Sequence, residues 1–309
     1  MDIEFLLWLQ SIRESTGNIF TPFMLGYSNI SYTWLLFVPV FIYWCIDKNS
    51  GIYLLLSVTL SRFINGFIKP TVCAYRPWVR DPRIIPIGHA TGYSFPSGHT
   101  MWAAPILGGV AVLYRKKFSW LSVLCMILIL LTAFARNYLG VHTPQDVVIG
   151  TILGLIALWI AAKILNHPEH EHKLMIIGLI LCVINLVYIE FKPYPMDYAD
   201  GKLLVDPFKM MNDSFHGTGI LAGFIAGRYI EKRYVQFKST GLNLKGIILA
   251  LIGFIPYYFI VFTFASAYPE IMNALTSMFT EHGGRFVLGF SFMFYPVALW
   301  PMVIKKFCE

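Results

Sequence analysis

Residues 144–164 read PQDVVIGTILGLIALWIAAKI, a run that stays apolar from Val147 to Ala162 apart from Thr151. Its length approaches the ~20 residues that a helix needs to cross a bilayer core about 30 Å thick. Shorter runs can cross with tilt, local thinning of the bilayer or help from neighbouring helices. Similar stretches lie near residues 31–46, 51–68, 98–114, 119–136, 173–190, 214–231, 246–267 and 285–304. The sequence therefore predicts an all-α, polytopic membrane helix bundle with about nine transmembrane helices.

The overall composition agrees with an integral membrane protein. With 57% hydrophobic and 13% charged residues, a chain of 309 residues has too little polar surface for a soluble globule. The net charge of +7 would suggest a nucleic-acid partner in a soluble protein, but the Lys and Arg residues fall mostly in short loops between the apolar stretches. We therefore expect no nucleic acid as a partner. The five cysteines show no paired spacing, so neither a disulfide framework nor a zinc site follows.

The N-terminal segment, residues 1–14, is acidic and amphipathic. Phe5, Leu6, Leu9 and Ile12 share one helical face. A cleavable signal peptide would have a basic start and an apolar core. We therefore expect an N-terminal interfacial helix.

The loops alternate in charge along the chain. Thirteen of the 24 basic residues lie in loops that a nine-helix topology places on one side, at residues 47–48, 115–117, 163–173, 228–245 and 305–306. Cytoplasmic loops are enriched in Lys and Arg. The opposite, non-cytoplasmic side holds three clusters of cations and histidines, and that side is otherwise poor in positive charge. Ionisable groups beside a bilayer tend to mark function.

One of these clusters holds Arg136, His142 and Asp146. Pro144 suits the first position of a helix with Thr143 as its N-cap, so His142 and Asp146 are expected to approach each other at the helix start. The carboxylate would then hold one ring nitrogen and leave the other free to attack phosphorus. The alternative is that Thr143 and Asp146 only form a capping box, and both interpretations can hold together.

A second cluster, Pro96-Ser97-Gly98-His99, lies where a loop turns into the 98–114 stretch. Backbone N–H groups at a helix start, beside a glycine without a side chain, form a natural cradle for phosphate. His99 would stand beside the bound group and protonate the departing oxygen. Taken alone, the cluster is equally compatible with an ordinary Ser N-cap and a solvated histidine.

The first cluster along the chain contains Lys69 and Arg76. Pro70 is expected to end the preceding helix, so that Lys69 lies at the end of that helix. Pro77 restricts the backbone conformation of Arg76. A guanidinium fork binds two phosphate oxygens at once, and a lysine adds a point charge. The alternative for each cation alone is a side chain that reaches from a helix end to the membrane interface.

Together, Lys-x6-Arg-Pro, Pro-Ser-Gly-His and Arg-x5-His-x3-Asp resemble the signature of the type 2 phosphatidic acid phosphatase superfamily over about residues 60–165. This group includes membrane lipid phosphatases, bacterial acid phosphatases, glucose-6-phosphatase and vanadium haloperoxidases. Every signature residue is present except the usual Ser before the third-motif Arg, which is Ala135 here. Ala135 removes one hydroxyl from the phosphate pocket, and we expect slightly weaker binding with the chemistry retained.

The resemblance implies a phosphoric monoester hydrolase that works by a two-step displacement without a metal or cofactor. His142 would attack phosphorus and form a phosphohistidine, with Asp146 fixing its orientation. His99 would protonate the leaving alkoxide and later activate water. The phosphate oxygens would be bound by the remaining signature residues, which are Lys69, Arg76, Ser97, Gly98 and Arg136. These groups would fill the role that metal ions have in many other phosphoryl-transfer enzymes.

The chain divides by composition into a catalytic core, residues 1–165, and accessory transmembrane helices, residues 166–309. The layout of the second part looks similar to glucose-6-phosphatase. Its polar stretch at 197–216 is predicted either to line the entrance and contact a headgroup or to be a solvated loop. The glycines that follow at spacing four are predicted to allow close helix packing. Arg62 and Asn65 are predicted to support Lys69 or to be satisfied structurally.

The sequence thus predicts a phosphatase of the cell membrane that acts on a phosphorylated lipid at the non-cytoplasmic face. Phosphatidate, phosphatidylglycerol phosphate and an isoprenyl phosphate or diphosphate all remain open as substrates. The alternatives are a phosphatase of glucose-6-phosphatase type for a soluble sugar phosphate, a lipid phosphotransferase, and a transporter whose basic residues line an anion path. A transporter is disfavoured because no internal repeat is visible and a passive path needs no histidines. The sequence does not determine the oligomeric state.

Overall fold

The computed structural model describes residues 2–88, 90–199, 201–264 and 267–308. Met1 of the expected interfacial helix and residues 265 and 266 of the expected 246–267 span lie outside the described residues. Of the chain, 80% is helical, and the two strands in the described part form a short antiparallel hairpin, β1 (Tyr198–Ala199) with β2 (Lys202–Leu203). The predicted all-α class is confirmed.

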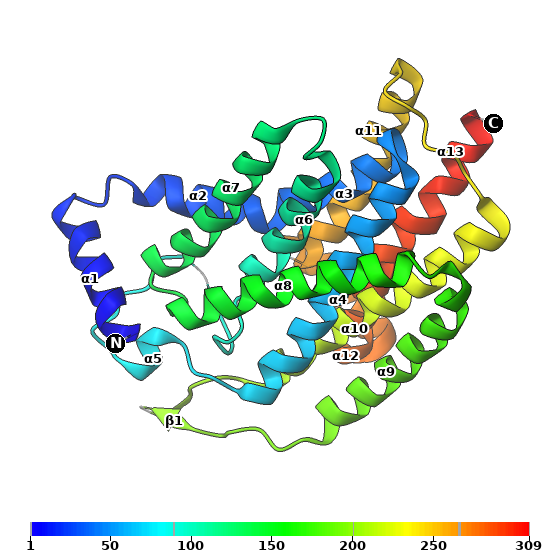
Figure 1. The fold of residues 1–309 in the computed structure, drawn as a ribbon. Coiled ribbons are helices and arrows are strands. Elements are labelled where there is room, and N and C mark those ends of the chain that lie inside the picture. The colour runs from blue at the N-terminus through cyan, green and yellow to red at the C-terminus, as the bar shows by residue number, and fades with distance from the viewer. Residues whose placement is uncertain (1, 89, 200, 265–266, 309) are drawn as a thin grey trace.

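Helices follow one another with short connections along the described chain (Figure 1). In order they are α1 (Asp2–Ser15), α2 (Thr21–Thr33), η1 (Trp34–Leu36), α3 (Phe37–Phe41), η2 (Ile42–Ile46), α4 (Lys48–Val72), α5 (Pro77–Arg80), α6 (Gly98–Tyr114), α7 (Ser119–Tyr138), α8 (Pro144–Leu165), η3 (Pro168–His170), α9 (Glu171–Phe191), α10 (Pro207–Ile230), η4 (Glu231–Val235), α11 (Leu244–Phe264), α12 (Pro269–Phe294), η5 (Tyr295–Leu299) and α13 (Trp300–Cys308).

Within the described residues, seven segments are long and apolar enough to cross a membrane, so the predicted count of nine is not confirmed. These segments are Thr21–Ile46, Lys48–Arg80, Ser119–Tyr138, Pro144–Leu165, Pro168–Phe191, Leu244–Phe264 and Pro269–Cys308. The two predicted spans missing from this set correspond to α6, which has 17 residues, and to α10, which carries polar side chains along its first half.

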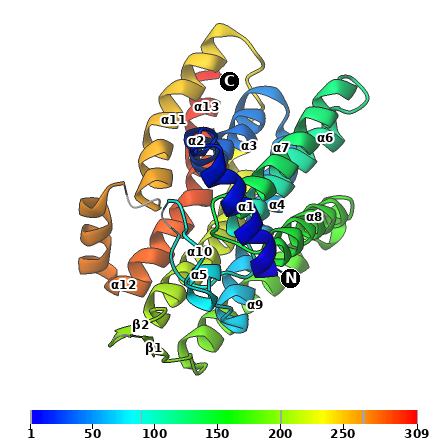
Figure 2. The same ribbon diagram turned by 90° about the vertical axis from the view of Figure 1, so that its left-hand side faces the viewer.

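Both of these helices lie inside the bundle. α6 packs against α4, α7 and α8, and α10 packs against α4, α9 and α12. Figure 2 shows α4 and α10 between the group α6, α7 and α8 and the pair α11 and α12. A helix enclosed by other helices needs no lipid-facing apolar surface, so hydropathy alone does not mark it as a span.

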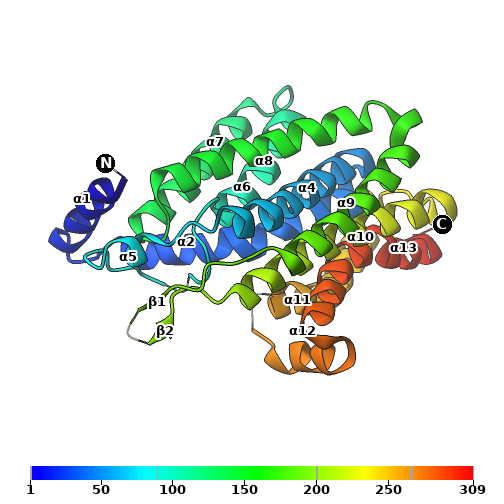
Figure 3. The ribbon, with the colours of Figure 1, turned by 90° about the horizontal axis from the view of Figure 1, so that it is seen from below.

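Basic loops from distant parts of the chain meet at one end of the bundle. Lys48 pairs with Glu231, Arg228 Nε lies 2.8 Å from a carboxylate oxygen of Glu171, and Lys305 donates to a carbonyl of η4. Figure 3 shows the α8–α9 turn and the C-terminus at this end, and α5 and the β hairpin at the other. Lys69 lies 21 residues after Lys48 on α4, about 31 Å away at 1.5 Å per residue. The arrangement agrees with the expected alternation of loops, and which end faces the cytoplasm stays a prediction.

The glycines of α10 bring helices unusually close. A Cβ atom added to Gly219 or Gly223 would lie 2.2 Å from the carbonyl oxygen of Phe286 or 2.1 Å from that of Phe290. On another face of α10, Gly217 approaches the backbone of α4. The close packing predicted for these glycines is confirmed, and it joins the accessory helices directly to α4.

Two local predictions differ in outcome. The N-terminal helix is confirmed as α1, and its buried Arg13 donates to the carbonyl oxygen of Tyr138 at 3.1 Å. Its position at a membrane interface stays a prediction. The expectation that Pro70 ends a helix was wrong, because α4 continues to Val72. A proline removes only its own N–H, and the last turn closes through Cys73 N–H to the Lys69 carbonyl at 3.2 Å.

Candidate active site

The three motif segments and the accessory helices enclose one cavity of about 290 Å³. Six of the eight predicted site residues line it: Lys69, Arg76, Gly98, His99, Arg136 and His142. The other two, Ser97 and Asp146, are buried next to it. Residues that are up to 73 positions apart along the chain, from Lys69 to His142, are therefore brought to one place.

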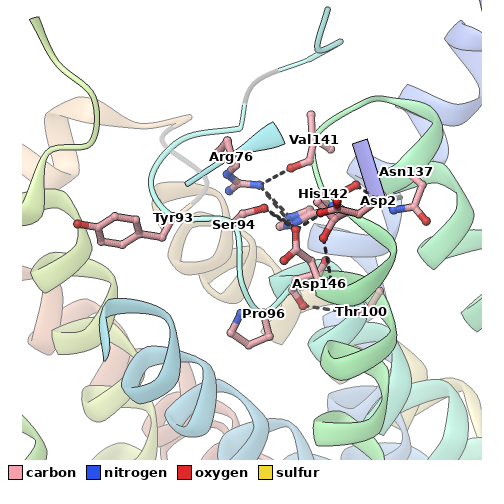
Figure 4. Close-up of polar contacts among 12 residues, drawn as sticks. Asp2, Arg76, Tyr93, Ser94, Pro96, Thr100, Asn137, Val141, His142 and Asp146 are labelled. Carbon is pink, nitrogen blue, oxygen red and sulfur yellow. Dashed lines mark hydrogen bonds and ion pairs between the residues drawn. The ribbon is translucent and has the colours of Figure 1, made fainter. Parts of the chain in front are cut away.

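His142 lies in the turn between α7 and α8 (Figure 4). Arg76 Nη1 is nearer to its Nε2 atom than to Nδ1, where the separation is 3.5 Å. Nε2 is 2.9 Å from Arg76 Nη1, whereas Nδ1 is 3.4 Å from Asp146 Oδ2 and 3.4 Å from Ser94 Oγ. Because a guanidinium only donates hydrogen bonds, Nε2 accepts from Arg76. The proton of the neutral ring is therefore on Nδ1, facing Asp146 and Ser94.

Asp146 has two roles in this arrangement. Its Oδ2 accepts from Thr143 N–H at 2.8 Å, and Thr143 Oγ1 accepts from Asp146 N–H at 3.3 Å, so the capping box expected at the start of α8 is present. The same Oδ2 atom faces His142 and accepts from Ser94 Oγ at 2.5 Å. The capping box and the approach to His142 are thus present together, and the catalytic role of this carboxylate stays a prediction.

Arg76 is fixed by backbone carbonyls. Nη1 donates to Val141 at 2.8 Å, Nη2 to Thr91 at 2.9 Å and Nε to Gly92 at 3.1 Å. The side chain is only 5% exposed. Since these three acceptors belong to the main chain of a loop or turn, the guanidinium is held against His142 by the local backbone.

The environment of His142 disfavours its protonated form. Burial is the largest cause, and the positive charges of Arg76, Arg136 and Lys69 add to it, so the pKa of His142 lies well below its ordinary value of 6.5. The ring is therefore neutral at pH 7. A neutral imidazole with an available nitrogen lone pair is the form that can act as a nucleophile.

The second motif meets only part of its expected geometry. His99 is in the first turn of α6, and its ring stacks on Tyr32 with 4.4 Å between centroids. Gly98 lines the cavity. Ser97 instead donates its backbone N–H to the Asp146 carbonyl at 3.0 Å, and its buried Oγ has no partner among the described residues. The Ser97 amide is therefore occupied by α8.

The other two motif cations reach the cavity from different helices. Lys69 Nζ lies 3.4 Å from the carbonyl oxygen of Tyr93, and Arg136 Nη1 donates to Ser28 Oγ at 2.7 Å. Ala135, which replaces the usual serine, is fully buried in an apolar cluster with Tyr138 and Leu139.

The accessory half contributes residues to this cavity, three of them from the 197–216 stretch that was predicted either to line the entrance or to be a solvated loop. Lys209, Asn212 and Asp213 come from α10, Phe264 from α11 and Arg285 from α12. The polar stretch is thus part of a helix in the cavity wall from position 207 onward, rather than a solvated loop. Asp206 followed by Pro207 is the signal that could have shown it, because an Asp N-cap and a proline at the first position mark a helix start.

Ser94, Tyr32, Arg62 and Asn65 complete the surroundings. Ser94 was part of the second motif segment but had no predicted role, and Tyr32 lies before all three motifs. Arg62 and Asn65 were predicted to support Lys69 or to be satisfied structurally, and both line the cavity themselves. Within the described ranges, no group of three or more His, Cys, Asp or Glu side chains is arranged to hold a metal ion.

The first half of the chain is similar in sequence to known phosphatases. Residues 50–168 match the sequence profile of the PAP2 superfamily. The chain is 27% identical over 124 residues to an undecaprenyl-diphosphatase of Sulfolobus acidocaldarius, which is 40% of this chain and 59% of that protein. It is 30% identical over 118 residues to phosphatidylglycerophosphatase B of Bacillus subtilis, which is 36% of this chain and 56% of that protein.

A longer match joins it to a lipid A 4'-phosphatase of Bacteroides thetaiotaomicron, with 25% identity over 174 residues, 52% of this chain and 75% of that protein. The chain thus spans less than two thirds of the length of the first two relatives. No solved structure matches this chain.

Proposed function

We propose that this chain, whose residues 50–168 match the PAP2 superfamily, is a membrane phosphatase that hydrolyses the phosphomonoester of a lipid phosphate. The observation that carries the proposal is the shared cavity, in which His142 and His99 face a common space with Lys69, Arg76 and Arg136. The relatives named above are phosphatases of lipids, and the apolar helices around the cavity suit a lipid substrate.

In the first step, His142 Nε2 attacks phosphorus and forms a phosphohistidine. Its lone pair is released when the phosphate oxygens take over the hydrogen bond that Arg76 Nη1 makes to Nε2 at 2.9 Å. The ring becomes cationic as the P–N bond forms, and the Nδ1 proton, which faces Asp146 Oδ2 at 3.4 Å, is stabilised by that carboxylate. Asp146 orients the ring and needs no proton transfer of its own.

As the P–N bond forms, the bond from phosphorus to the lipid oxygen breaks, and that oxygen takes a proton from His99. In the second step, His99 takes a proton from water, whose oxygen attacks phosphorus and releases inorganic phosphate and neutral His142. Lys69, Arg76, Arg136 and the Gly98 amide bind the equatorial oxygens. The unpartnered Oγ of Ser97 is assigned to the same task.

The proposed location is the cell membrane, with the cavity on the non-cytoplasmic side. The support is the gathering of basic loops at the other end of the bundle, where Lys48, Arg228, Lys232 and Lys305 lie. Loops of this composition favour the cytoplasm.

The test is release of inorganic phosphate by purified protein in detergent with EDTA present. Wild type, His142→Ala and Arg83→Ala are compared on prenyl, glycerolipid and sugar phosphates. We expect His142→Ala to lower kcat on the lipid by at least ~10³-fold, because removing a nucleophile leaves only binding and electrostatic stabilisation. Arg83, which is exposed and paired with Asp81, is the control and should keep wild-type turnover. Equal turnover by His142→Ala and wild type would refute the mechanism, and turnover of the sugar phosphate alone would refute the substrate class.

A further inference from the structure

We propose that the cavity contains a second anion-binding subsite, formed by Arg62 of α4, Lys209 of α10 and Arg285 of α12, that binds the inner phosphate of a lipid diphosphate. The inference rests on the proposed function and names the substrate class more closely. None of the three residues belongs to the sequence motifs, and two of them come from the accessory half.

The charge of the cavity exceeds what a single phosphate requires. Among the described lining residues there are six cationic side chains and one carboxylate, that of Asp213. The three motif cations already match one phosphoryl group, which carries a charge of about −2 at pH 7. The three further cations outnumber Asp213 by two. An uncompensated positive charge of this size, in a cavity enclosed by helices, favours a substrate with a second anionic group.

Arg285 is the clearest member of the subsite. Its side chain makes no hydrogen bond or ion pair with any residue that the structure describes, and its Nε atom is buried. Leaving a guanidinium without partners at membrane depth is unfavourable, so such groups normally pair or line a functional path. A phosphate in the cavity would supply the missing acceptors in the bidentate geometry that arginine prefers.

The chain places Arg285 through a break in α12. Thr280 adopts a non-helical conformation with φ 66° and ψ 170°, and its Oγ1 accepts from Gly283 N–H at 3.3 Å, so a new helical segment starts there. That segment is attached to α10 by Asn212, whose Nδ2 donates to Glu281 at 2.6 Å and whose Oδ1 lies 2.6 Å from His282 Nδ1. Arg285 follows in the next turn and is thereby fixed in the cavity wall.

Arg62 marks the side of the cavity that the second phosphate would occupy. Among the described residues its side chain makes one hydrogen bond, a long one of 3.4 Å to Asn65. Its guanidinium lies 5.1 Å from the ring centroid of Trp102 and 5.3 Å from that of Phe264. Both rings contact Tyr32, at 6.2 and 6.0 Å between centroids. Tyr32 in turn stacks on His99. Arg62 is therefore on the side of the proposed acid, whereas Arg76 is on the side of the nucleophile.

This placement fits the geometry of an in-line displacement, in which the leaving group departs opposite the nucleophile. With a lipid diphosphate, His142 takes the terminal phosphoryl group, the bond to the bridging oxygen breaks, and the inner phosphate leaves with the lipid. His99 gives its proton to that bridging oxygen, and water later releases inorganic phosphate from His142. The products are a lipid monophosphate and inorganic phosphate, and the inner phosphate stays beside Arg62 and Arg285 throughout.

The test compares a prenyl diphosphate with the prenyl monophosphate of the same chain length, in detergent, for wild type, Arg285→Ala, Arg285→Lys and Lys209→Ala. Wild type should have the higher kcat/KM on the diphosphate. Arg285→Ala should lower the diphosphate to monophosphate ratio of kcat/KM by roughly 10- to 100-fold, mainly through KM, since it removes charge-assisted hydrogen bonds to the inner phosphate. Arg285→Lys should restore part of the diphosphate to monophosphate ratio of kcat/KM, because lysine keeps the positive charge but lacks the paired donors of the guanidinium.

Lys209 is exposed, so its replacement tests the subsite without disturbing the packing of α12, and it should lower the ratio in the same direction by a smaller factor. The control is Arg83→Ala, which should leave the ratio unchanged. The subsite is refuted if Arg285→Ala and Lys209→Ala reduce turnover of both lipids equally, or if wild type prefers the monophosphate. Failure of the proposed function looks different: wild type would then release no more phosphate from either lipid than His142→Ala does, and the subsite would fall with it.

Discussion

At the scale of single residues, the contact between Arg76 and His142 governs the proposed chemistry. The guanidinium is bound to three backbone carbonyls and also donates to Nε2 at 2.9 Å, so it occupies the nitrogen that would attack phosphorus. In the absence of substrate this interaction holds the lone pair and lowers the basicity of the ring. A bound phosphate competes for the same donor and frees the nucleophile only when its target is present.

The first prediction concerns pH. Because burial and the neighbouring cations lower the pKa of His142 below 6.5, the neutral, reactive form persists into mildly acid solution. The acid limb of the wild-type kcat/KM profile should therefore lie below pH 6.5, where His142 becomes protonated in the free enzyme. Arg76→Gln removes one of the cations that lower this pKa, so the acid limb should move to higher pH.

The measurement is kcat/KM against pH for wild type, Arg76→Gln and the control Arg83→Gln. Arg76→Gln will also lose absolute activity because it loses a phosphate ligand, but the position of the limb is independent of that loss. An acid limb that stays in place or moves to lower pH in Arg76→Gln would contradict the explanation. The Arg83→Gln limb should coincide with that of the wild type.

The second prediction concerns Ser94, whose hydroxyl donates to Asp146 Oδ2 at 2.5 Å. Ser94→Ala leaves the carboxylate with one fewer donor and frees it to rotate away from His142. A hydrogen bond to a charged group contributes about 1.5–3 kcal/mol, so we expect kcat to fall roughly 10- to 100-fold with KM changed less than about twofold. Steady-state kinetics check this, and a rise in KM at constant kcat would show that Ser94 binds substrate instead.

The residue scale is also where sequence reasoning was most informative. Thr143 as N-cap, the approach of Asp146 to His142, and the gathering of six signature residues in one cavity follow from local motifs. Ser97 was assigned to phosphate, but its backbone N–H bonds to the Asp146 carbonyl. That contact joins two helices far apart in sequence, so no local pattern could have revealed it.

At the scale of secondary-structure elements, α10 decides how the accessory half meets the site. Its start at Pro207 puts Lys209, Asn212 and Asp213 on helical turns in the cavity wall. Its glycines let α12 approach until backbones touch. The sequence indicated both the polar residues and the close packing, but the partner of the glycine face could not be predicted, because parallel and antiparallel neighbours present the same pattern.

The third prediction tests the contact between α10 and α12. Gly223→Ala adds a Cβ atom that would lie 2.1 Å from the Phe290 carbonyl oxygen, so α12 must shift. Overpacking of this kind destabilises by about 1–3 kcal/mol. We expect a lower midpoint of thermal unfolding in detergent and, because Arg285 is on the displaced helix, weaker activity.

The matched control is Gly26→Ala in α2, where an added Cβ would meet nothing within 4 Å. There the exchange should be neutral or stabilising by up to about 1 kcal/mol, since alanine favours helix over glycine. Equal melting temperatures for the two variants would show that the α10–α12 contact is looser than described.

At the scale of the whole molecule, the two halves share a single interior. Trp44 and Tyr43 donate to the carbonyl oxygens of Pro296 and Val297 at 2.9 and 3.2 Å, and their rings pack with residues from both halves in one apolar cluster. The division at residue 165 therefore stays a prediction about where the site residues lie along the chain, and it does not mark a boundary in the packed interior. The contacts between halves depend on long-range packing, which composition and motifs do not specify.

The fourth prediction follows from this shared interior. A fragment of residues 1–165 should fail to give a monodisperse, protease-resistant protein in detergent, because the apolar cluster would lose its partners from the second half. Coexpression with a fragment of residues 166–309 should restore a stable complex. Size-exclusion chromatography and limited proteolysis provide the measurement, and a well-folded isolated fragment would show that the first half is an autonomous unit.

The hydrogen bond from Ser97 N–H to the Asp146 carbonyl at 3.0 Å has one more implication. It links the main chain of α6, two residues before His99, to the main chain of α8 beneath His142. The distance between the two imidazoles is thus set in part by a main-chain hydrogen bond, which side-chain substitutions do not remove. Other cavity residues come from α10, α11 and α12. Under the proposed function, substitutions on those helices would therefore change which headgroup binds without altering the spacing of the two histidines.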